Sequence, residues 1–270
     1  MRASLVISLT ALSFLGSLSV SHTASATERH FGFVYESPVI AKGRAELQPW
    51  TTVRTGRADY YSRLDARLGF QFGLLENLQG ALFWNVSGVT EDIRIPGAAL
   101  KSRLSSTDFQ SVTGQLKYRF SDPVADAFGS AFLVDGFVGP LAAGVEGRFI
   151  LDDQLGSLLL ALNLVGGISE EFEVLSRAVN TFGATAAAGY FVTPNLVTSL
   201  EVRNENRYSQ LFKRSVLYLG PSVSYVATRY WLTLAVQPQV AALKGATAGH
   251  DLDLTENEYL QTRLMFGFQL

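Results

Sequence analysis

The sequence predicts an all-β protein, a single antiparallel transmembrane β-barrel of about twelve strands, and three observations support this prediction. The 270-residue chain opens with an export signal. Its later segments alternate apolar and polar residues, which is typical of strands with two different faces. Short and long connections between these segments largely alternate, because such a barrel has tight turns at one end and larger loops at the other.

Residues 1–26 have the features of a cleaved signal peptide. Arg2 supplies the positive charge, residues 5–20 form an apolar core diluted by serine and threonine, and residues 24–26 (Ala-Ser-Ala) match a cleavage site. A membrane anchor helix is the alternative, but the apolar run is short and interrupted by serine. We therefore expect cleavage after residue 26, and export.

The chain after the signal is expected to hold one barrel domain, residues 44–270, since no linker or low-complexity tract follows. Residues 27–43 precede the first expected strand. This N-terminal segment contains Phe31, Phe33 and Tyr35, and it is long enough to fold into the lumen from the periplasmic side as a plug.

Composition narrows the class of protein. Hydrophobic residues make up 47% of the chain and the mean hydropathy is +0.17, yet no apolar run reaches the roughly 20 residues of a spanning helix. In lipid a closed sheet is the alternative to a helix, because it satisfies every backbone polar group internally. The slightly acidic charge argues against nucleic acid as a partner, and the absence of cysteine excludes disulfides and thiolate metal sites.

The alternation is clearest in residues 62–74 and 260–270. Leu64, Leu68 and Phe70 share one face of the first segment, and charged or small residues occupy the other. Alternation alone does not tell which face is inside, and a soluble sheet would invert it; the export signal and loop asymmetry favour the apolar face outside. Ten and fourteen strands are the alternative counts. The twelve expected strands are residues 44–55, 60–74, 78–90, 108–121, 129–139, 142–152, 156–168, 178–192, 196–207, 213–226, 229–242 and 256–270.

Connection lengths orient the barrel. An even number of strands places both termini in the periplasm, beside the tight turns. Pro49, Pro221 and Pro238 fall inside expected strands, and we expect a local kink at each because proline cannot donate to the ladder. The connections expected to be long, polar outer loops are residues 91–107, 169–177, 207–213 and 243–255.

The polar face of the strands is strongly charged, with both signs present. Rings of charged side chains select ions in channels, whereas a salt-bridged interior would only make the barrel rigid. Twelve strands lie between a filled eight-stranded barrel and an open sixteen-stranded one, so a narrow pore and a closed interior are both allowed. The residues expected to line the lumen are Glu46, Arg63, Asp65, Arg67, Lys117, Arg119, Asp135, Glu146, Arg148, Glu201, Arg203 and Arg263.

Several short motifs are distributed along the chain after the signal. They are Ser37-Pro38, Lys42-Gly43, Glu46-Leu47 with Trp50, Tyr60-Tyr61, Arg63-Leu64-Asp65, Gly73-Leu74 with Glu76-Asn77-Leu78-Gln79, and Thr193-Pro194-Asn195. These motifs resemble those of an uncharacterised family of Gram-negative outer-membrane β-barrel proteins. The resemblance runs over most of the chain after the signal and implies a barrel and its location; it implies no activity. Leu270 stands where a terminal phenylalanine is usual in such barrels.

Residues for catalysis or metal binding are few. After cleavage only His30 and His250 remain, and they are expected at opposite ends of the barrel, so they cannot form one site. Asp251, Asp253 and Glu256 could hold Ca²⁺ through oxygen atoms, but their spacing does not match an EF-hand and a charged loop without metal is the preferred interpretation.

The function predicted from the sequence is a narrow passive pore for small hydrophilic solutes in the outer membrane. A non-conducting structural or binding barrel with a salt-bridged interior is the alternative, and a lipid-modifying enzyme is a third hypothesis; we expect no enzyme activity, no cofactor and no metal. Expected partners are outer-membrane lipid, the barrel-assembly machinery through the C-terminal strand, and small solutes.

Overall fold

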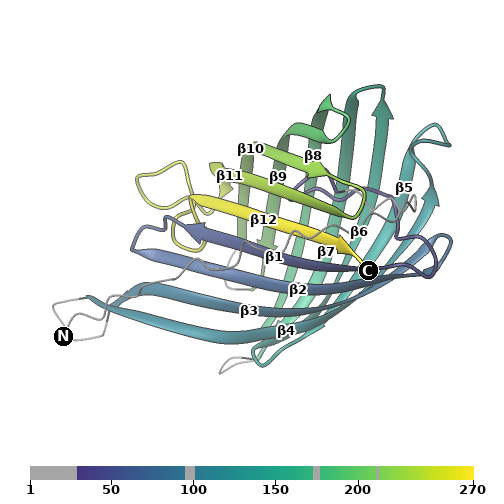
Figure 1. The fold of residues 1–270 in the computed structure, drawn as a ribbon. Coiled ribbons are helices and arrows are strands. Elements are labelled where there is room, and N and C mark those ends of the chain that lie inside the picture. The colour runs from purple at the N-terminus through teal and green to yellow at the C-terminus, as the bar shows by residue number, and fades with distance from the viewer. Residues whose placement is uncertain (1–28, 95–100, 173–176, 211–212) are drawn as a thin grey trace, which may run out of the picture.

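The computed structural model describes residues 29–94, 101–172, 177–210 and 213–270, and these residues form twelve β-strands closed into one barrel (Figure 1). None of them forms a helix long and apolar enough to cross a membrane. The strands are β1 (Ala45–Thr55), β2 (Tyr61–Leu75), β3 (Leu78–Arg94), β4 (Lys101–Ser121), β5 (Gly129–Val138), β6 (Ala142–Leu155), β7 (Leu158–Glu171), β8 (Arg177–Thr193), β9 (Leu196–Tyr208), β10 (Lys213–Val226), β11 (Tyr230–Lys244) and β12 (Leu260–Gln269).

The topology is a simple up-and-down barrel. Each strand pairs antiparallel with the next along the chain, and β1 pairs with β12 to close the sheet. Closure leaves no free edge, so every strand has two partners. The predicted fold class, an all-β antiparallel barrel of twelve strands, is confirmed.

The two ends of the barrel differ. At one end, here called the turn end, lie the connections that follow β2, β4, β6, β8 and β10, together with the start of β1 and the end of β12. At the other, the loop end, lie the connections that follow β1, β3, β5, β7, β9 and β11. The connection between β11 and β12 (residues 245–259) is a long described loop at the loop end.

The prediction of a long loop over residues 91–107 is wrong. β3 continues to Arg94 and β4 already begins at Lys101, so most of this stretch is paired strand. Strands that project beyond the apolar band meet water on both faces, so their polar sequence resembles that of a loop. The last expected strand, by contrast, is too long: β12 begins at Leu260 rather than at residue 256.

The three prolines interrupt the pairing on one side of their strands. β10 and β11 are unpaired between residues 219–221 and 236–238, and Pro221 and Pro238 lie in this gap. Each is still paired on its other side, with β9 and β12 respectively. At Pro49 the pairing with β12 is interrupted but resumes in the same register. The missing N–H groups therefore weaken the ladder locally without opening the barrel.

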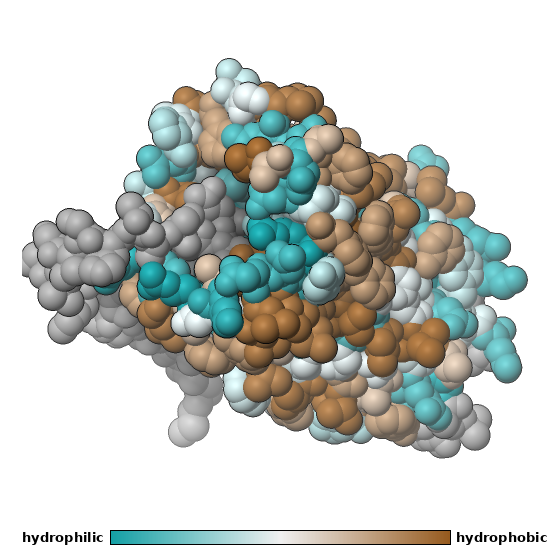
Figure 2. Space-filling model, turned by 90° about the vertical axis from the view of Figure 1, so that its right-hand side faces the viewer, coloured by the Kyte–Doolittle hydropathy of each residue, from teal (hydrophilic) through white to brown (hydrophobic). Residues whose placement is uncertain are grey.

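The faces of the strands are sorted as the alternation predicts. In β2, Leu64 and Leu68 point outward with 47% and 46% of their surface exposed, whereas Gln71 on the opposite face is 6% exposed. In β1, Leu47 is exposed and Glu46 is buried. Hydrophobic side chains consequently cover much of the outer face seen in Figure 2. An outer face of this kind is suited to hydrocarbon.

The N-terminal segment, described here as residues 29–43, lies inside the turn-end half of the lumen. Phe31 and Val34 are fully buried and pack with Leu159, Ala161, Ala187 and Val197, which point inward from β7, β8 and β9. After crossing the lumen the segment reaches β2, where Gly43 donates a backbone hydrogen bond to the Gly73 carbonyl at 3.1 Å. This half of the barrel is therefore a packed core.

Candidate functional site in the lumen

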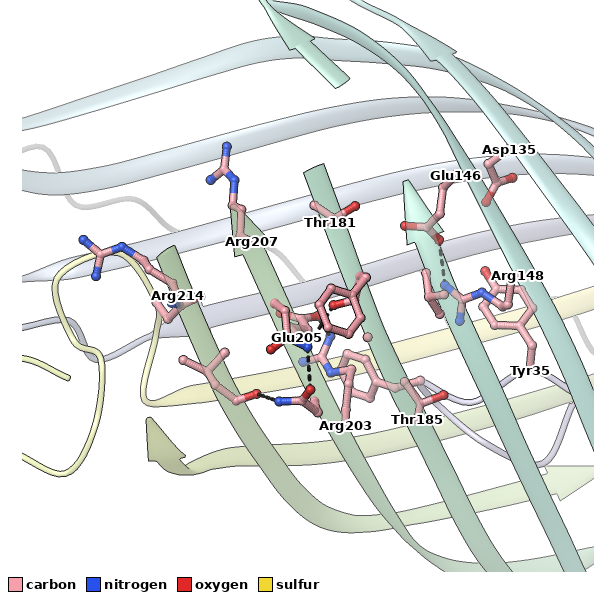
Figure 3. Close-up of a pocket in the computed structure, with 18 of the residues that line it drawn as sticks. Tyr35, Asp135, Glu146, Arg148, Thr181, Thr185, Arg203, Glu205, Arg207 and Arg214 are labelled. Atoms are coloured by element: carbon pink, nitrogen blue, oxygen red, sulfur yellow. Dashed lines mark hydrogen bonds and ion pairs between the residues drawn. The ribbon is translucent and has the colours of Figure 1, made fainter. Parts of the chain in front are cut away.

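The loop-end half of the lumen contains a cavity of about 540 Å³. Its walls come from the inner faces of strands around the barrel, and Glu256 and Asn257 of the β11–β12 loop also line it. Tyr35 and Phe33 of the N-terminal segment belong to the lining, so the segment forms its floor towards the turn end. Figure 3 shows Tyr35 beside Arg148.

Arginine dominates the charge of this cavity. Among the described residues seven arginines and four carboxylates line it. The arginines are Arg54, Arg67, Arg148, Arg203, Arg207, Arg214 and Arg263. The carboxylates are Asp135, Glu146, Glu205 and Glu256.

Several of these charges are paired along one strand. Arg148 and Glu146, two residues apart on β6, form an ion pair at 2.9 Å, and Arg203 and Glu205 do the same on β9 at 2.7 Å (Figure 3). Residues two apart on a strand point to the same face, so such pairs are built into the alternation. Arg203 also donates to Gln261 on β12 at 2.8 Å.

Two arginines at the floor of the cavity have aromatic partners instead. The guanidinium carbon of Arg67 lies 3.6 Å from the ring centre of Phe83 and 4.8 Å from that of Trp50. The guanidinium of Arg263 lies 4.0 Å from the Phe33 ring centre and 5.5 Å from that of Trp50. Among the described residues no carboxylate lies within ion-pair distance of either guanidinium, so stacking on rings is their main compensation.

Tyr35 reports the positive field at this floor. Burial alone would raise the pKa of its phenol, but nearby guanidinium groups outweigh burial and lower that pKa below its ordinary value. The groups responsible are Arg29, Arg67 and Arg148. A negative charge is thus favoured at this point of the lumen.

Glu201 on β9 binds the backbone of the N-terminal segment. One carboxylate oxygen accepts a hydrogen bond from the Gly32 N–H at 2.7 Å, and the other accepts from Phe33 at 2.7 Å and Val34 at 3.2 Å. Glu201 is fully buried, so these bonds replace its hydration. A side chain on Gly32 would overlap Ala235 on β11, so the close approach requires glycine.

Further along the segment, two other strands hold the backbone. The Asn163 side chain on β7 accepts from the Tyr35 N–H at 2.7 Å and donates to the Tyr35 carbonyl at 2.8 Å. The Lys117 ammonium group on β4 donates to the carbonyls of Glu36 and Pro38, both at 2.5 Å. The unpaired backbone of an irregular segment is thereby satisfied inside the barrel.

A ladder of glutamines links the segment to the first strands. The Ile40 N–H donates to Gln79 on β3 at 2.9 Å, Gln79 donates to Gln71 on β2, and Gln71 donates to Gln48 on β1. Gln48 also accepts from the Trp50 indole at 3.1 Å. These amides fill the turn-end lumen with hydrogen bonds where charges would be costly.

The structure distributes the twelve residues expected in the lumen over three regions. Glu201 and Lys117 contact the N-terminal segment; Glu46 lies deep in the turn-end half, where Trp231 donates to it at 3.2 Å; and Arg119 pairs with Asp122 at the turn end. Arg63 and Asp65 pair with each other on β2 towards the loop end. The six that line the cavity are Arg67, Asp135, Glu146, Arg148, Arg203 and Arg263.

Sequence reasoning missed other residues of the lumen. Arg54 and Arg207 lie on the same strand faces as Glu46 and Arg203, so the alternation could have identified them. Arg29 could not be found in this way, because it precedes the first strand. Its guanidinium lies 4.0 Å from the Tyr35 ring centre, and its carbonyl accepts from Ser224 and Thr233.

The residues considered for catalysis and metal binding have structural partners. His30 is buried in the turn-end half and its Nδ1 lies 2.7 Å from Glu36, whereas His250 lies in the exposed β11–β12 loop at the other end. In the same loop Asp253 is fully buried and pairs with Arg214 at 2.8 Å. No group of acidic and histidine side chains suited to a metal occurs in the described parts of the chain.

Comparison with known proteins places this geometry among outer-membrane barrels. The chain resembles the NanC porin, with a TM-score of 0.56 and 10% identity over 83% of this chain and 100% of that one. It also resembles the β-domain of the Bordetella autotransporter BrkA, with a TM-score of 0.53 and 8% identity over 85% of this chain and 100% of that one. At such identities the likeness shows the fold alone, an outer-membrane barrel fold similar to that of a porin.

Comparison with curated proteins gives no match. A family model described as "Family of unknown function (DUF6662)" matches residues 23–137 and 165–270, which is most of the chain. The resemblance to an uncharacterised family of outer-membrane barrels is therefore confirmed, and the chain belongs to the family of unknown function DUF6662.

Proposed function

We propose that the chain is a narrow passive pore for small hydrophilic solutes in the outer membrane, and that its N-terminal segment closes the pore at the turn end. One observation supports this most strongly: a cavity lined by seven arginines among the described residues occupies the loop-end half of the lumen, and an irregular segment rather than the barrel wall forms its floor. A segment held by hydrogen bonds to side chains can leave without breaking the strand ladder.

Planar-bilayer recording tests this proposal. The refolded chain without residues 1–26 should give small and infrequent openings, and a variant that also lacks residues 29–40 should give larger and steady ones. The variant keeps Lys42, which bridges to Gly73 of β2. Slower migration after heating in gel electrophoresis would confirm that both barrels fold. A folded deletion variant that stays silent in several salts would contradict the pore.

The non-conducting barrel is the competing function, and the extent of the contacts made by the segment favours it. Residues 29–43 receive hydrogen bonds from, or donate them to, side chains on at least eight strands, among them Glu201, Asn163 and Lys117. Silence of the deletion variant together with retained folding would select this function. We propose no catalytic role, because the two histidines lie at opposite ends.

We further propose that the outward apolar face contacts lipid, which gives a depth-dependent prediction. Leu68 lies at the middle of β2 and Ser62 lies near its loop end, and both belong to the outward face. Leu68→Arg should destabilise the barrel in lipid vesicles by about 2–4 kcal/mol, and Ser62→Arg by roughly 0–1 kcal/mol, because hydrocarbon penalises charge most at its centre. Urea unfolding in vesicles measures both. Equal, small effects would argue against a membrane position.

A further inference from the structure

The floor of the lumen cavity carries positive charge that the described part of the protein does not neutralise. Arg67 and Arg263 both line the cavity, and neither has a carboxylate within ion-pair distance among the described residues. Of the other arginines near the floor, Arg148 pairs with Glu146 and Arg203 pairs with Glu205, whereas Arg29 lies against the Tyr35 ring. Asp135 offsets one charge, and its carboxylate accepts a hydrogen bond from Gln115 at 2.7 Å.

Unsatisfied donors occur at the same place. Two guanidinium nitrogens of Arg67, Nε and Nη2, are buried without a hydrogen-bond partner. The equivalent edge of Arg103 at the barrel exterior binds both carboxylate oxygens of Asp92, at 2.7 and 3.2 Å. Buried donors without a partner are costly and rare, and they commonly mark the place of water or an ion.

The Trp50 ring sets an upper limit on the separation of the two arginines. Both guanidinium groups lie against the Trp50 ring, at 4.8 and 5.5 Å from its centre, so their central carbons are no more than about 10 Å apart. Ring stacking fixes the planar groups in place. Arg263 is oriented further by hydrogen bonds from its Nε to Thr52 at 3.0 Å and from its Nη1 to the Gly32 carbonyl at 3.1 Å.

We propose that Arg67 and Arg263 form a binding site for an oxyanion, the carboxylate or phosphate group of a small hydrophilic solute. Guanidinium groups bind both kinds of group through paired, charge-assisted hydrogen bonds. The cavity walls add hydroxyl groups from Thr113, Thr181 and Thr185, which can bind the polar remainder of such a solute. The inference rests on the proposed function only in that a solute must reach the lumen; it names the class of that solute.

Binding to the refolded chain in detergent micelles tests this site without any measurement of current. Inorganic phosphate and succinate are the two probes, and succinamide is the uncharged control of the same size as succinate. Calorimetry should show saturable binding of phosphate, succinate or both, and none of succinamide. Binding of phosphate alone assigns a phosphoryl group as ligand, and binding of succinate alone assigns a carboxylate. Absence of saturable binding to the unaltered chain would overturn the site.

Variants locate the site. Arg67→Gln and Arg263→Gln should each weaken binding at least tenfold, whereas Arg103→Gln, which removes an arginine from the exterior, should leave it unchanged. Arg67→Lys keeps the charge without the paired donors, so it should bind with intermediate affinity, and it covers the case in which Arg67→Gln fails to fold. If all four variants bound the probe as tightly as the unaltered chain, the assignment of the site to Arg67 and Arg263 would be overturned.

The outcomes separate the two proposals. A barrel that binds phosphate or succinate through Arg67 but conducts no current refutes the pore and leaves the binding site intact. A barrel that conducts after removal of the segment but binds neither probe refutes the binding site and leaves the pore intact.

Discussion

Glu201→Gln is expected to raise the fraction of time that the refolded barrel conducts by about 10- to 100-fold. The carboxylate of Glu201 accepts three backbone N–H groups from residues 32–34. Glutamine has one acceptor oxygen, and its NH₂ group would face N–H donors. Loss of one such charged hydrogen bond costs about 1.5–3 kcal/mol, which corresponds to this change in the ratio of open to closed forms.

Single-channel recording measures this effect, and the same strand supplies a control. Glu205→Gln removes a carboxylate from the same face of β9, four residues nearer the loop end, where Glu205 pairs with Arg203. The substitution should leave the open fraction near that of the unaltered chain because Glu205 holds no part of the segment in the described structure. If both substitutions act alike, general loss of negative charge in the lumen explains the change and Glu201 does not hold the segment closed.

The strands and their faces could be predicted because the signal for them is local. Alternation places Arg67 and Leu68 on opposite faces whatever the rest of the chain does, and tight turns fix the order of the strands. Closure of β1 against β12 then brings Arg263 beside Thr52, and the charged residues of separate strands meet in one lumen. Six of the twelve residues expected there line a common cavity.

The role of Glu201 could not be predicted in the same way. Its partners precede it by 167 to 169 residues, and residues 29–43 have no periodic pattern that would show their path. The extension of β3 and β4 was missed for a different reason. In β4, Leu104 is the one apolar residue between residues 101 and 107, so the hydropathy pattern there carries no period-2 signal although the backbone pairs with β3 as in any hairpin.

Asp253→Asn is expected to free the β11–β12 loop while the barrel stays folded. The Asp253 carboxylate is fully buried and accepts backbone N–H groups from Thr255 at 3.2 Å and Glu256 at 3.3 Å. It also accepts from the Asn257 side chain at 2.9 Å and pairs with Arg214 at 2.8 Å. Breaking a buried ion pair on one side costs about 3–5 kcal/mol, because the Arg214 charge is then left with the more distant Glu256 carboxylate, 3.8 Å away, as its carboxylate partner.

Loss of the Asp253–Arg214 ion pair should destabilise the loop rather than the strands. Asp253 lies outside the strand ladder, and opening of the loop exposes few apolar residues. Trypsin cleavage after Lys244, at the base of the loop, should therefore accelerate by roughly two to four orders of magnitude, as 3–5 kcal/mol requires. Asp251→Asn is the matched control. It removes the same charge from an exposed position of the same loop and should leave the cleavage rate unchanged.

The two aspartates also distinguish a structural loop from a metal site. If the acidic loop were held by a bound divalent cation, chelation would accelerate cleavage of the unaltered chain, and Asp251→Asn would act in the same direction as Asp253→Asn. If Arg214 takes the place of a cation, chelation has no effect and only Asp253→Asn opens the loop. The second result is expected, because the oxygens of Asp253 already have four hydrogen-bond donors among the described residues.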